Sequence, residues 1–336
     1  MKTKTTHPGK MRRRRLLLAV AAGLASLLIP ASAHAGLMSF GSGANAFNIN
    51  FVTVGNAGNA NDAGAGGGIY SSNYGGVAYN FNMAVTAAAQ DWITKATNLG
   101  MTNVTAGAWT GNQPAASITW YKAAGFVNWL NTSTGHQAAY QLNGTNGSLT
   151  LWTSAQAWQA GGENLYRHKD AVYFLPSENE WYKAAYHKND GVTANYWDYA
   201  TGSNSIPTAV SGGTGAGTAV YGQSVGQGPA DVNNSGGLSA YGTQGQDGNV
   251  FEWQESAFDG VNNSVAELRG LRGGDWSSTE DQLRPTFRSG FGPSNAGTNI
   301  GFRVASVEAV PEPVTAMFGI GLGLICVCRR RRGPSL

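Results

Sequence analysis

Thiol chemistry is confined to one end of the chain. The two cysteines, Cys326 and Cys328, both lie in a short apolar run that precedes four arginines. Thiolates act as nucleophiles, as ligands for soft metals and as the precursors of disulfides. Because the rest of the chain contains no cysteine, the sequence excludes disulfides, cysteine nucleophiles and thiolate metal sites from the body of the protein.

Histidine is the next candidate for a metal ligand or a general base. Beyond residue 35 the chain has only His136, His168 and His187, with no H-x-x-x-H or His/carboxylate spacing. We expect His168 to lie in an exposed loop and His187 to interact with the dipole at a helix C-terminus. The sequence leaves a Ser/His/Asp triad open, although no G-x-S-x-G elbow supports one.

A helix start is the clearest local signal, in the segment LPSENEWYKAAY over residues 175–186. Ser177 and Glu180 have the spacing of a capping box, in which each side chain accepts a hydrogen bond from a free backbone N–H. Acidic residues in the first turn also suit the helix dipole. We predict a short helix over residues 178–187.

Two further helices are expected nearer the N-terminus. One covers residues 86–98, with Thr86 as the N-cap residue and with Trp92 and Ile93 on the buried face. The other covers residues 119–130. Its apolar positions recur at helical spacing: Ala123, Phe126, Val127 and Leu130.

The remaining sequence predicts strands and long loops. Residues 36–80 contain short alternating runs, such as 47–52, separated by glycine, and we predict strands joined by tight turns. Residues 200–246 are rich in Gly, Ser, Thr and Asn and show little periodicity. Loops of this length in a compact domain need a bound ion or packed aromatic side chains to hold them.

Composition indicates a folded, loop-rich extracellular domain. Only 12% of residues are charged, 48 are glycine, and 10 Trp, 12 Phe and 13 Tyr supply apolar surface for a core. Seven of the 22 basic residues lie in 1–35 and four at 329–332, so residues 36–310 carry 11 basic and 18 acidic residues, a net charge of −7. An acidic body excludes an electrostatic nucleic-acid interface.

The N-terminus has the order of a secretory signal peptide over residues 1–35. Four arginines at 12–15 precede an apolar run at 16–29, and Ala33-His34-Ala35 forms an A-x-A cleavage site. We expect cleavage after Ala35, with Ala33 as the alternative.

The C-terminus, over residues 310–332, has a Pro-Glu-Pro triplet at 311–313, an apolar run at 314–328 and four arginines. The run is short for a permanent span, which needs roughly 20 residues, and the arginines favour a cytoplasmic end. This segment resembles the PEP-CTERM sorting signal of Gram-negative bacteria. The resemblance implies export to the cell surface, passage through the inner membrane and processing by an exosortase. The alternative is a plain C-terminal membrane anchor.

Five blocks in fixed order carry a second resemblance, over about residues 45–306. They are ITWYKAA at 118–124, the segment 175–186, GNVFEW at 248–253, LRGGDW at 271–276 and GFRV at 301–304. In this order they resemble the sulfatase-modifying factor, or formylglycine-generating enzyme, family. The resemblance implies an α+β, C-type-lectin-like formylglycine-generating-enzyme fold, rich in loops, with small mixed sheets and a few short helices.

The family's copper site is altered in this sequence. In its aerobic enzymes, two cysteines downstream of the R-G-G-S block bind copper and activate oxygen. The matching positions here are Ser278 and Leu283. Neither side chain binds Cu(I) as thiolate does, so we expect no copper. Other relatives hold non-haem iron with histidines, for which the chain has no matching spacing.

The resemblance also implies a calcium site at the GNVFEW turn. Its ligands would be the carbonyl groups of Gly248 and Val250 and the carboxylate of Glu252, a set of hard oxygen donors. The family's Asp or Asn three residues before the first glycine is Gly245 here. The alternative is that Glu252 belongs to a buried hydrogen-bond or ion-pair network.

The two arginines of the later blocks have a structural interpretation. We expect Arg272 and Arg303 to donate to buried carbonyl groups or to pair with acids such as Asp275.

Three functions follow from these observations. The first is an exported cell-surface or matrix protein, non-catalytic, that binds exopolysaccharide or another envelope component, since aromatic faces stack on sugar rings. The second is an oxidoreductase of the same family with an altered metal site. The third is a structural adhesin or matrix filler with no defined ligand, which the sequence does not separate from the first.

Overall fold

The computed structural model describes Met1 and residues 36–64, 73–144 and 147–307. The chain divides into two units, Met1–Ser32 and Ala33–Leu336, and the fold described here belongs to the second. Apart from Met1, the predicted signal peptide and the predicted C-terminal tail lie outside the described residues. Within the described ranges, no helix has the length and apolar character to cross a membrane.

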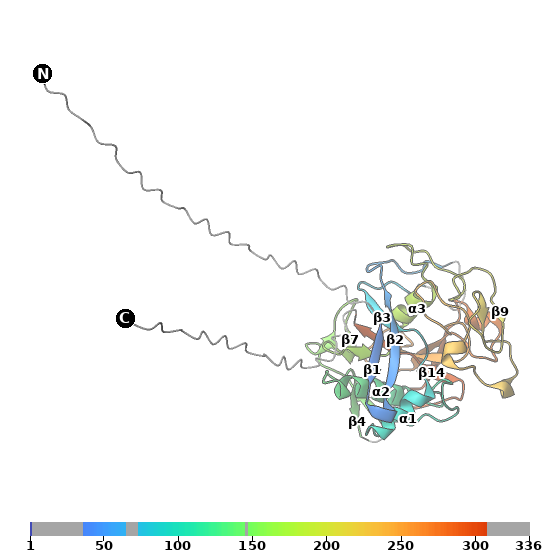
Figure 1. The fold of residues 1–336 in the computed structure, drawn as a ribbon, viewed down its shortest axis with the longest axis horizontal. Coiled ribbons are helices and arrows are strands. Elements are labelled where there is room, and N and C mark those ends of the chain that lie inside the picture. Colours follow the sequence, from blue (N-terminus) through green and yellow to red (C-terminus); the bar gives the residue numbers. More distant parts are fainter. Residues whose placement is uncertain (2–35, 65–72, 145–146, 308–336) are drawn as a thin grey trace. The chain divides into compact units, whose positions relative to one another are not determined.

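A five-stranded antiparallel sheet joins the two ends of the domain (Figure 1). Its strands, in spatial order, are β1 (Leu37–Phe40), β2 (Phe47–Val54), β3 (Phe81–Ala84), β15 (Ala305–Val307) and β8 (Tyr173–Phe174). The strand expected at 47–52 is confirmed as β2, in which buried and exposed residues largely alternate. The last strand lies beside β3, with Val307 opposite Phe81, so the first and last parts of the domain share one core.

A four-stranded mixed sheet brings three of the sequence blocks together. Its strands, in spatial order, are β13 (Ser289–Phe291), β12 (Arg269–Arg272), β11 (Phe251–Ala257) and β14 (Ile300–Phe302). Only β11 and β14 are parallel. In this register Glu252 is opposite Arg272 on one side and Gly301 on the other, so the GNVFEW, LRGGDW and GFRV blocks meet along β11.

Three two-stranded ribbons complete the strands. They are β4 (Gln141–Asn143) with β5 (Ser148–Thr150), β6 (Ala157–Trp158) with β7 (Asn164–His168), and β9 (Thr208–Ala209) with β10 (Thr218–Ala219). Four short 3-10 helices also occur in the described residues: Gly43–Asn45, Val225–Gln227, Val232–Asn234 and Glu280–Leu283.

Two of the three expected helices begin where the sequence predicts. Helix α2 (Trp120–Ser133) starts after Thr119, whose side chain accepts a hydrogen bond from the Lys122 N–H, and the four apolar positions expected on its inner face are all buried. It extends three residues beyond the predicted end. Helix α3 (Glu178–Tyr186) starts with the predicted capping box, because Ser177 and Glu180 each accept from the other's backbone N–H.

The N-cap prediction for the first helix is wrong. Helix α1 (Gln90–Asn98) starts after Ala89, which provides no side-chain cap, and not after Thr86. The Ala88 N–H donates to the Phe302 carbonyl group, and the Ala88 carbonyl group accepts from Ala115. These pairings with distant segments hold the chain extended up to residue 89, which local capping preference does not reveal.

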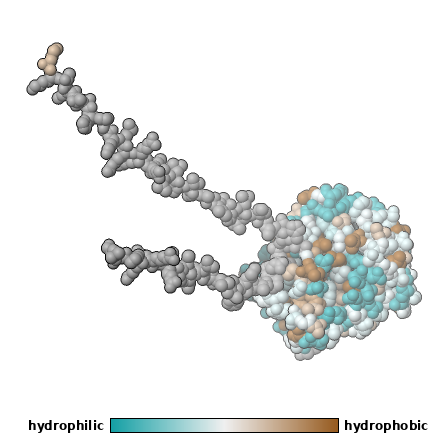
Figure 2. Space-filling view, in the orientation of Figure 1, coloured by the Kyte–Doolittle hydropathy of each residue, from teal (hydrophilic) through white to brown (hydrophobic). Residues whose placement is uncertain are grey.

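The core is built around buried tryptophans whose indole N–H groups are all satisfied. Trp120 donates to the Gln254 carbonyl group and Trp253 to the Ile118 carbonyl group, each at 2.9 Å. These two bonds connect β11 to the first residue of α2 and to the segment just before it. On the face shown in Figure 2, hydrophobic residues appear in small groups between hydrophilic ones, as expected for a domain whose large side chains lie inside.

Aromatic packing holds the long loops at 200–246. Tyr199, Tyr221 and Leu283 form one buried cluster with Ala219, and the Tyr221 hydroxyl donates to the Pro207 carbonyl group at 2.6 Å. The turn that follows requires glycine at 248, because the backbone there has φ of 87° and a Cβ atom would collide with the Val220 carbonyl oxygen.

Replacing Thr119 by alanine should reduce the free energy of unfolding by about 1 kcal/mol, because the Lys122 N–H loses its only side-chain acceptor. Urea unfolding measures the change. Thr132→Ala is the matched control, since this exposed hydroxyl only bonds back to the Asn128 carbonyl group within α2. Equal losses in the two variants would contradict the assigned helix start.

Candidate functional site

The three histidines lie apart from one another and do not form a metal centre. Among the described residues, no group of three His, Cys, Asp or Glu side chains is placed to hold a metal ion. His168 ends β7 and is only 8% exposed, so the expectation of an exposed loop is wrong. His136 follows α2 and contacts Tyr173 edge-on.

His187 is the C-cap residue of α3, but the predicted dipole interaction requires a charged ring. Burial lowers the pKa of His187 below its ordinary value, so the ring is neutral at neutral pH. Its Nδ1 lies 2.9 Å from the Tyr241 hydroxyl group. His187 therefore forms a buried hydrogen bond at the end of α3 and does not supply a positive charge to the helix dipole.

The positions that correspond to the copper ligands are packed into the interior. The Ser278 hydroxyl group accepts from the Asp275 N–H at 2.9 Å and donates to the Asp275 carboxylate at 3.2 Å. Leu283 is fully buried in the cluster with Tyr199 and Tyr221. A hydroxyl group with partners and an alkyl side chain do not fit a copper ion, which prefers thiolate ligands.

The carboxylate expected to bind calcium is already surrounded by donors. Glu252 Oε1 accepts from Arg303 Nη2 at 2.8 Å, and Oε2 accepts from Arg303 Nε at 3.0 Å and from Trp181 Nε1 at 2.6 Å. The N–H of Gly248 donates to the Gly273 carbonyl group at 2.6 Å, and Val250 is buried. Calcium binding by Gly248, Val250 and Glu252 stays a prediction, and this carboxylate geometry does not fit it, because a bound ion would replace the guanidinium.

Arg272 and Arg303 donate to buried carbonyl groups, as expected. Their acidic partners are not Asp275, the example given in the prediction, but Glu178 and Glu252. Arg303 Nη1 donates to the Ala84 carbonyl group at 2.8 Å in addition to its pair with Glu252. Arg272 pairs with Glu178 at 2.7 Å. Asp275 pairs with neither arginine and instead accepts from Ser277, Ser278 and Asn299.

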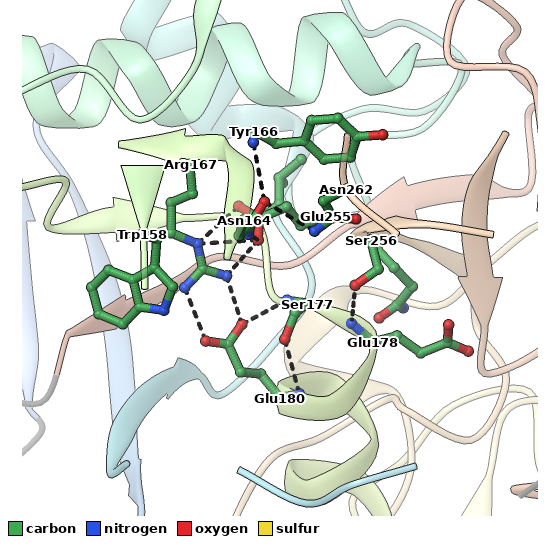
Figure 3. A network of polar contacts seen from close by, with 12 residues as sticks. Trp158, Asn164, Tyr166, Arg167, Ser177, Glu178, Glu180, Glu255, Ser256 and Asn262 are labelled. Atoms are coloured by element: carbon green, nitrogen blue, oxygen red, sulfur yellow. Dashed lines mark hydrogen bonds and ion pairs between the residues drawn. The ribbon is translucent and has the colours of Figure 1, made fainter. Parts of the chain in front are cut away.

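Arg167 is a third buried arginine, which the sequence does not predict. Arg167 on β7 donates to both oxygens of Glu180 at 3.0 and 2.9 Å, and to Glu255 through Nε at 2.9 Å and through Nη2 at 2.6 Å (Figure 3). All three side chains are at most 1% exposed. Arg167 stands in the charged stretch YRHKD, whose composition indicates an exposed loop, so no local signal pointed to this cluster.

The pKa values of the two carboxylates in this cluster are shifted in opposite directions. Burial favours the neutral form of Glu180, but the charge of Arg167 and its hydrogen bonds keep the pKa of Glu180 below its ordinary value. For Glu255 burial dominates, and the pKa is raised in spite of Arg167. Both carboxylates are enclosed and neither faces solvent.

A cleft of about 250 Å³ opens beside this cluster. Its walls combine aromatic, amide and guanidinium groups: Tyr79, Trp158, Asn164, Arg167, Asn179 and Asn262. The Trp158 ring is half-buried, with the Arg167 guanidinium 5.3 Å from its centre and the Tyr79 ring edge-on to it. Neither Ser278 nor Leu283 lines this cleft.

Comparison with known sequences decides the family. A sequence model described as the sulfatase-modifying factor enzyme 1-like domain matches residues 51–307, and one for the PEP-CTERM protein-sorting motif matches residues 309–332. The chain belongs to the sulfatase-modifying factor enzyme 1-like family. Both resemblances seen in the sequence are thereby confirmed. The sorting motif marks an exported protein and implies processing by an exosortase-type enzyme.

Solved structures support the same fold. Treponema denticola variable protein 1 superimposes with a TM-score of 0.55 at 18% identity, covering 81% of this chain and 99% of that one. CarF superimposes with a TM-score of 0.52 at 19% identity, covering 77% of this chain and 98% of that one. The expected α+β fold, with small mixed sheets and three short helices in the described residues, is confirmed.

Part of the chain is also similar in sequence to an oxygenase. Hercynine oxygenase of Mycolicibacterium thermoresistibile is 31% identical over 170 residues, which cover 42% of this chain. The matched part of the chain spans 34% of the length of that relative.

Proposed function

We propose that this protein is a non-catalytic, exported cell-surface or extracellular-matrix protein that binds exopolysaccharide, or another glycan of the envelope, in the cleft beside Arg167. The C-terminal segment would hold it in the inner membrane before an exosortase-type enzyme processes the tail. The observation that carries this proposal is that the open cleft offers aromatic and amide groups that suit a sugar ring. The positions matched to the family's copper ligands, Ser278 and Leu283, are instead packed into the interior.

The cleft suits a sugar ring because it offers both kinds of contact that a sugar uses. The indole of Trp158 and the ring of Tyr79 supply apolar surface, and the half-buried side chains of Asn179 and Asn262 supply amide groups for hydroxyl groups. Its volume of about 250 Å³ lies just below the usual range for small-molecule pockets, about 300–1,000 Å³. That size fits one residue of a polymer better than a large free ligand.

The cleft lacks the groups that glycoside hydrolysis uses. Canonical hydrolysis needs two carboxyl groups facing the same bond. Among the described residues that line the cleft, Glu163 is the only carboxylate. Glu180 and Glu255 lie behind Arg167 with no exposed surface, so they do not reach a substrate. Binding without turnover is therefore the function that the geometry supports.

Replacing Trp158 by alanine should weaken binding to the producing organism's exopolysaccharide about ten-fold, because the cleft loses its largest apolar wall. Affinity electrophoresis of the mature protein in gels containing the polysaccharide measures the dissociation constant. The matched control is Trp197→Ala, since Trp197 is also half-buried but lies outside the cleft and contacts Lys188. Absence of binding by the wild-type protein, or equal binding by the Trp158 variant, would refute the proposal.

An oxidoreductase with an altered metal site is the second candidate, favoured by the similarity to hercynine oxygenase over 170 residues. Metal analysis of the purified mature protein separates the two functions. Iron or copper at one equivalent per chain, together with oxidation of a thiol substrate, would support the oxidoreductase and contradict the binding function as the sole activity.

A further inference from the structure

The cleft beside Arg167 presents one charge that is free to meet a ligand, and that charge is negative. Of the described residues that line the cleft, Arg167 carries the only positive charge and Glu163 the only negative one. Arg167 is 1% exposed, whereas Glu163 is exposed. None of the ion pairs formed by the described residues includes Glu163. A ligand in the cleft therefore meets the carboxylate of Glu163 directly.

The positive charge of Arg167 is already committed to the protein. Its Nε, Nη1 and Nη2 atoms donate to Glu180 and Glu255 over distances of 2.6 to 3.1 Å (Figure 3). The Tyr79 hydroxyl group, on the same wall, also donates to Glu180, at 2.7 Å. A ligand carboxylate that drew Arg167 away would leave buried carboxylates without their cation, which is strongly unfavourable. Arg167 is therefore no anchor for an acidic sugar.

The backbone fixes Glu163 next to the aromatic wall of the cleft. The β6–β7 ribbon turns through Gly161 and Gly162, whose φ angles of 80° and 121° suit glycine. Asn164, the next residue after Glu163, lies opposite Trp158 in the ribbon. The Asn164 side chain donates to Glu255 at 2.6 Å, which ties this end of the ribbon to the buried cluster. The carboxylate of Glu163 is thus held beside the indole of Trp158.

The charge around the cleft has the same sign as Glu163. Residues 36–310 carry a net charge of −7, so a polyanionic chain is repelled at long range. Residues 65–72, outside the described ranges but close in sequence to the lining residue Gly76, read AGGGIYSS and contain no charged residue. No cation from this stretch offsets Glu163.

We propose that the cleft selects sugars by charge, preferring an amino sugar with a free, protonated amino group and excluding a uronic acid. This inference rests on the proposed glycan-binding function and adds the chemical class of the sugar. With the sugar ring against Trp158, an ammonium group can donate a charge-assisted hydrogen bond to Glu163. A sugar carboxylate would lose water without gaining a cation.

Three tetrasaccharides with one β-1,4-linked backbone test this preference: oligomers of glucosamine, glucose and glucuronic acid. Isothermal titration calorimetry of the mature protein is carried out at low ionic strength and about pH 5.5, where an amine is protonated and an exposed glutamate is ionised. We expect the glucosamine oligomer to bind about four-fold more tightly than the glucose oligomer, and the glucuronic acid oligomer at least about four-fold more weakly. About 0.5 M NaCl should reduce both ratios, because salt screens the charges.

Variants at exposed positions assign the preference to Glu163. Glu163→Gln should bring the glucosamine-to-glucose ratio to within about two-fold of one, and Glu163→Lys should favour the glucuronic acid oligomer. Asp198→Asn is the matched control, since it removes the same charge from an exposed position outside the cleft and should keep the wild-type ratio. An unchanged ratio in Glu163→Gln would overturn the assignment.

The outcomes separate this inference from the proposed function. Equal binding of the three tetrasaccharides by the wild-type protein would overturn charge selection and leave glycan binding intact. Binding of none of them would also overturn this inference, and the exopolysaccharide gels with Trp158→Ala would then decide the proposed function independently. Tighter binding of the glucuronic acid oligomer would show that a cation faces the ligand, contrary to the committed state of Arg167.

Discussion

Replacement of Arg167 by methionine should destabilise the folded protein by about 3–5 kcal/mol, with a fall in Tm of roughly 10 °C, because two buried carboxylates lose the arginine that pairs with both of them. Arg167 makes four hydrogen bonds of 3.0 Å or less to Glu180 and Glu255, and none of the three side chains is exposed to water that could replace them. Urea unfolding at pH 7 measures the loss.

The penalty in Arg167→Met should shrink as the pH falls. In the wild-type protein the pKa of Glu180 is lowered, so its stabilising contribution is present above its unfolded pKa of about 4.3 and disappears as the pH falls through the folded value. Without the guanidinium, burial raises the pKa of both carboxylates, and the variant gains stability on protonation. The difference between the two proteins should therefore narrow between pH 7 and pH 4.

Arg284→Met is the matched control for this prediction. Arg284 pairs with Asp281 at 3.4 Å, but the two side chains are 35% and 80% exposed, so solvent screens the pair. We expect a change of at most about 0.5 kcal/mol with no pH dependence beyond that of the wild-type protein. Similar losses at Arg284 and Arg167 would show that the buried cluster contributes no special stability.

Breaking the second buried pair should have an effect of similar size. Arg303→Met should destabilise the protein by about 3–5 kcal/mol, because the buried Glu252 carboxylate would lose its cationic partner and the Ala84 and Gln244 carbonyl groups would lose a donor. Chemical denaturation at pH 7 measures the change. Glu252→Gln should cost less, since the amide keeps an acceptor for Trp181 Nε1.

A double-mutant cycle tests whether the two residues act as a pair. In Arg303→Met combined with Glu252→Gln, no uncompensated charge is left, so the loss should be smaller than the sum of the two single losses by at least about 1 kcal/mol. Additive losses would indicate that Arg303 stabilises the fold through its backbone hydrogen bonds alone. The cycle also bears on calcium, because a calcium ion at Glu252 would make Arg303→Met the milder change.

Local sequence patterns predicted two helices of this fold well because the forces that start a helix act within one turn. The capping box of Ser177 and Glu180 and the cap at Thr119 are both made between residues three apart. Helix α1 begins later than predicted because a pairing with Phe302, far along the chain, competes with the local cap at Thr86. A local capping preference does not set the start of a helix where a long-range backbone hydrogen bond holds the chain extended.

By itself the sequence determined the family, the C-terminal sorting motif, the absence of cysteine from residues 36–310, and the strands and helices whose periodicity and caps are local. Only the tertiary structure decided which charges meet. Arg167 and Glu255 are 88 residues apart, and His168 and Asp247 are buried although they lie in polar stretches of the sequence. Burial and ion pairing depend on chain segments that become neighbours only on folding, whereas capping and periodicity depend on residues within a few positions.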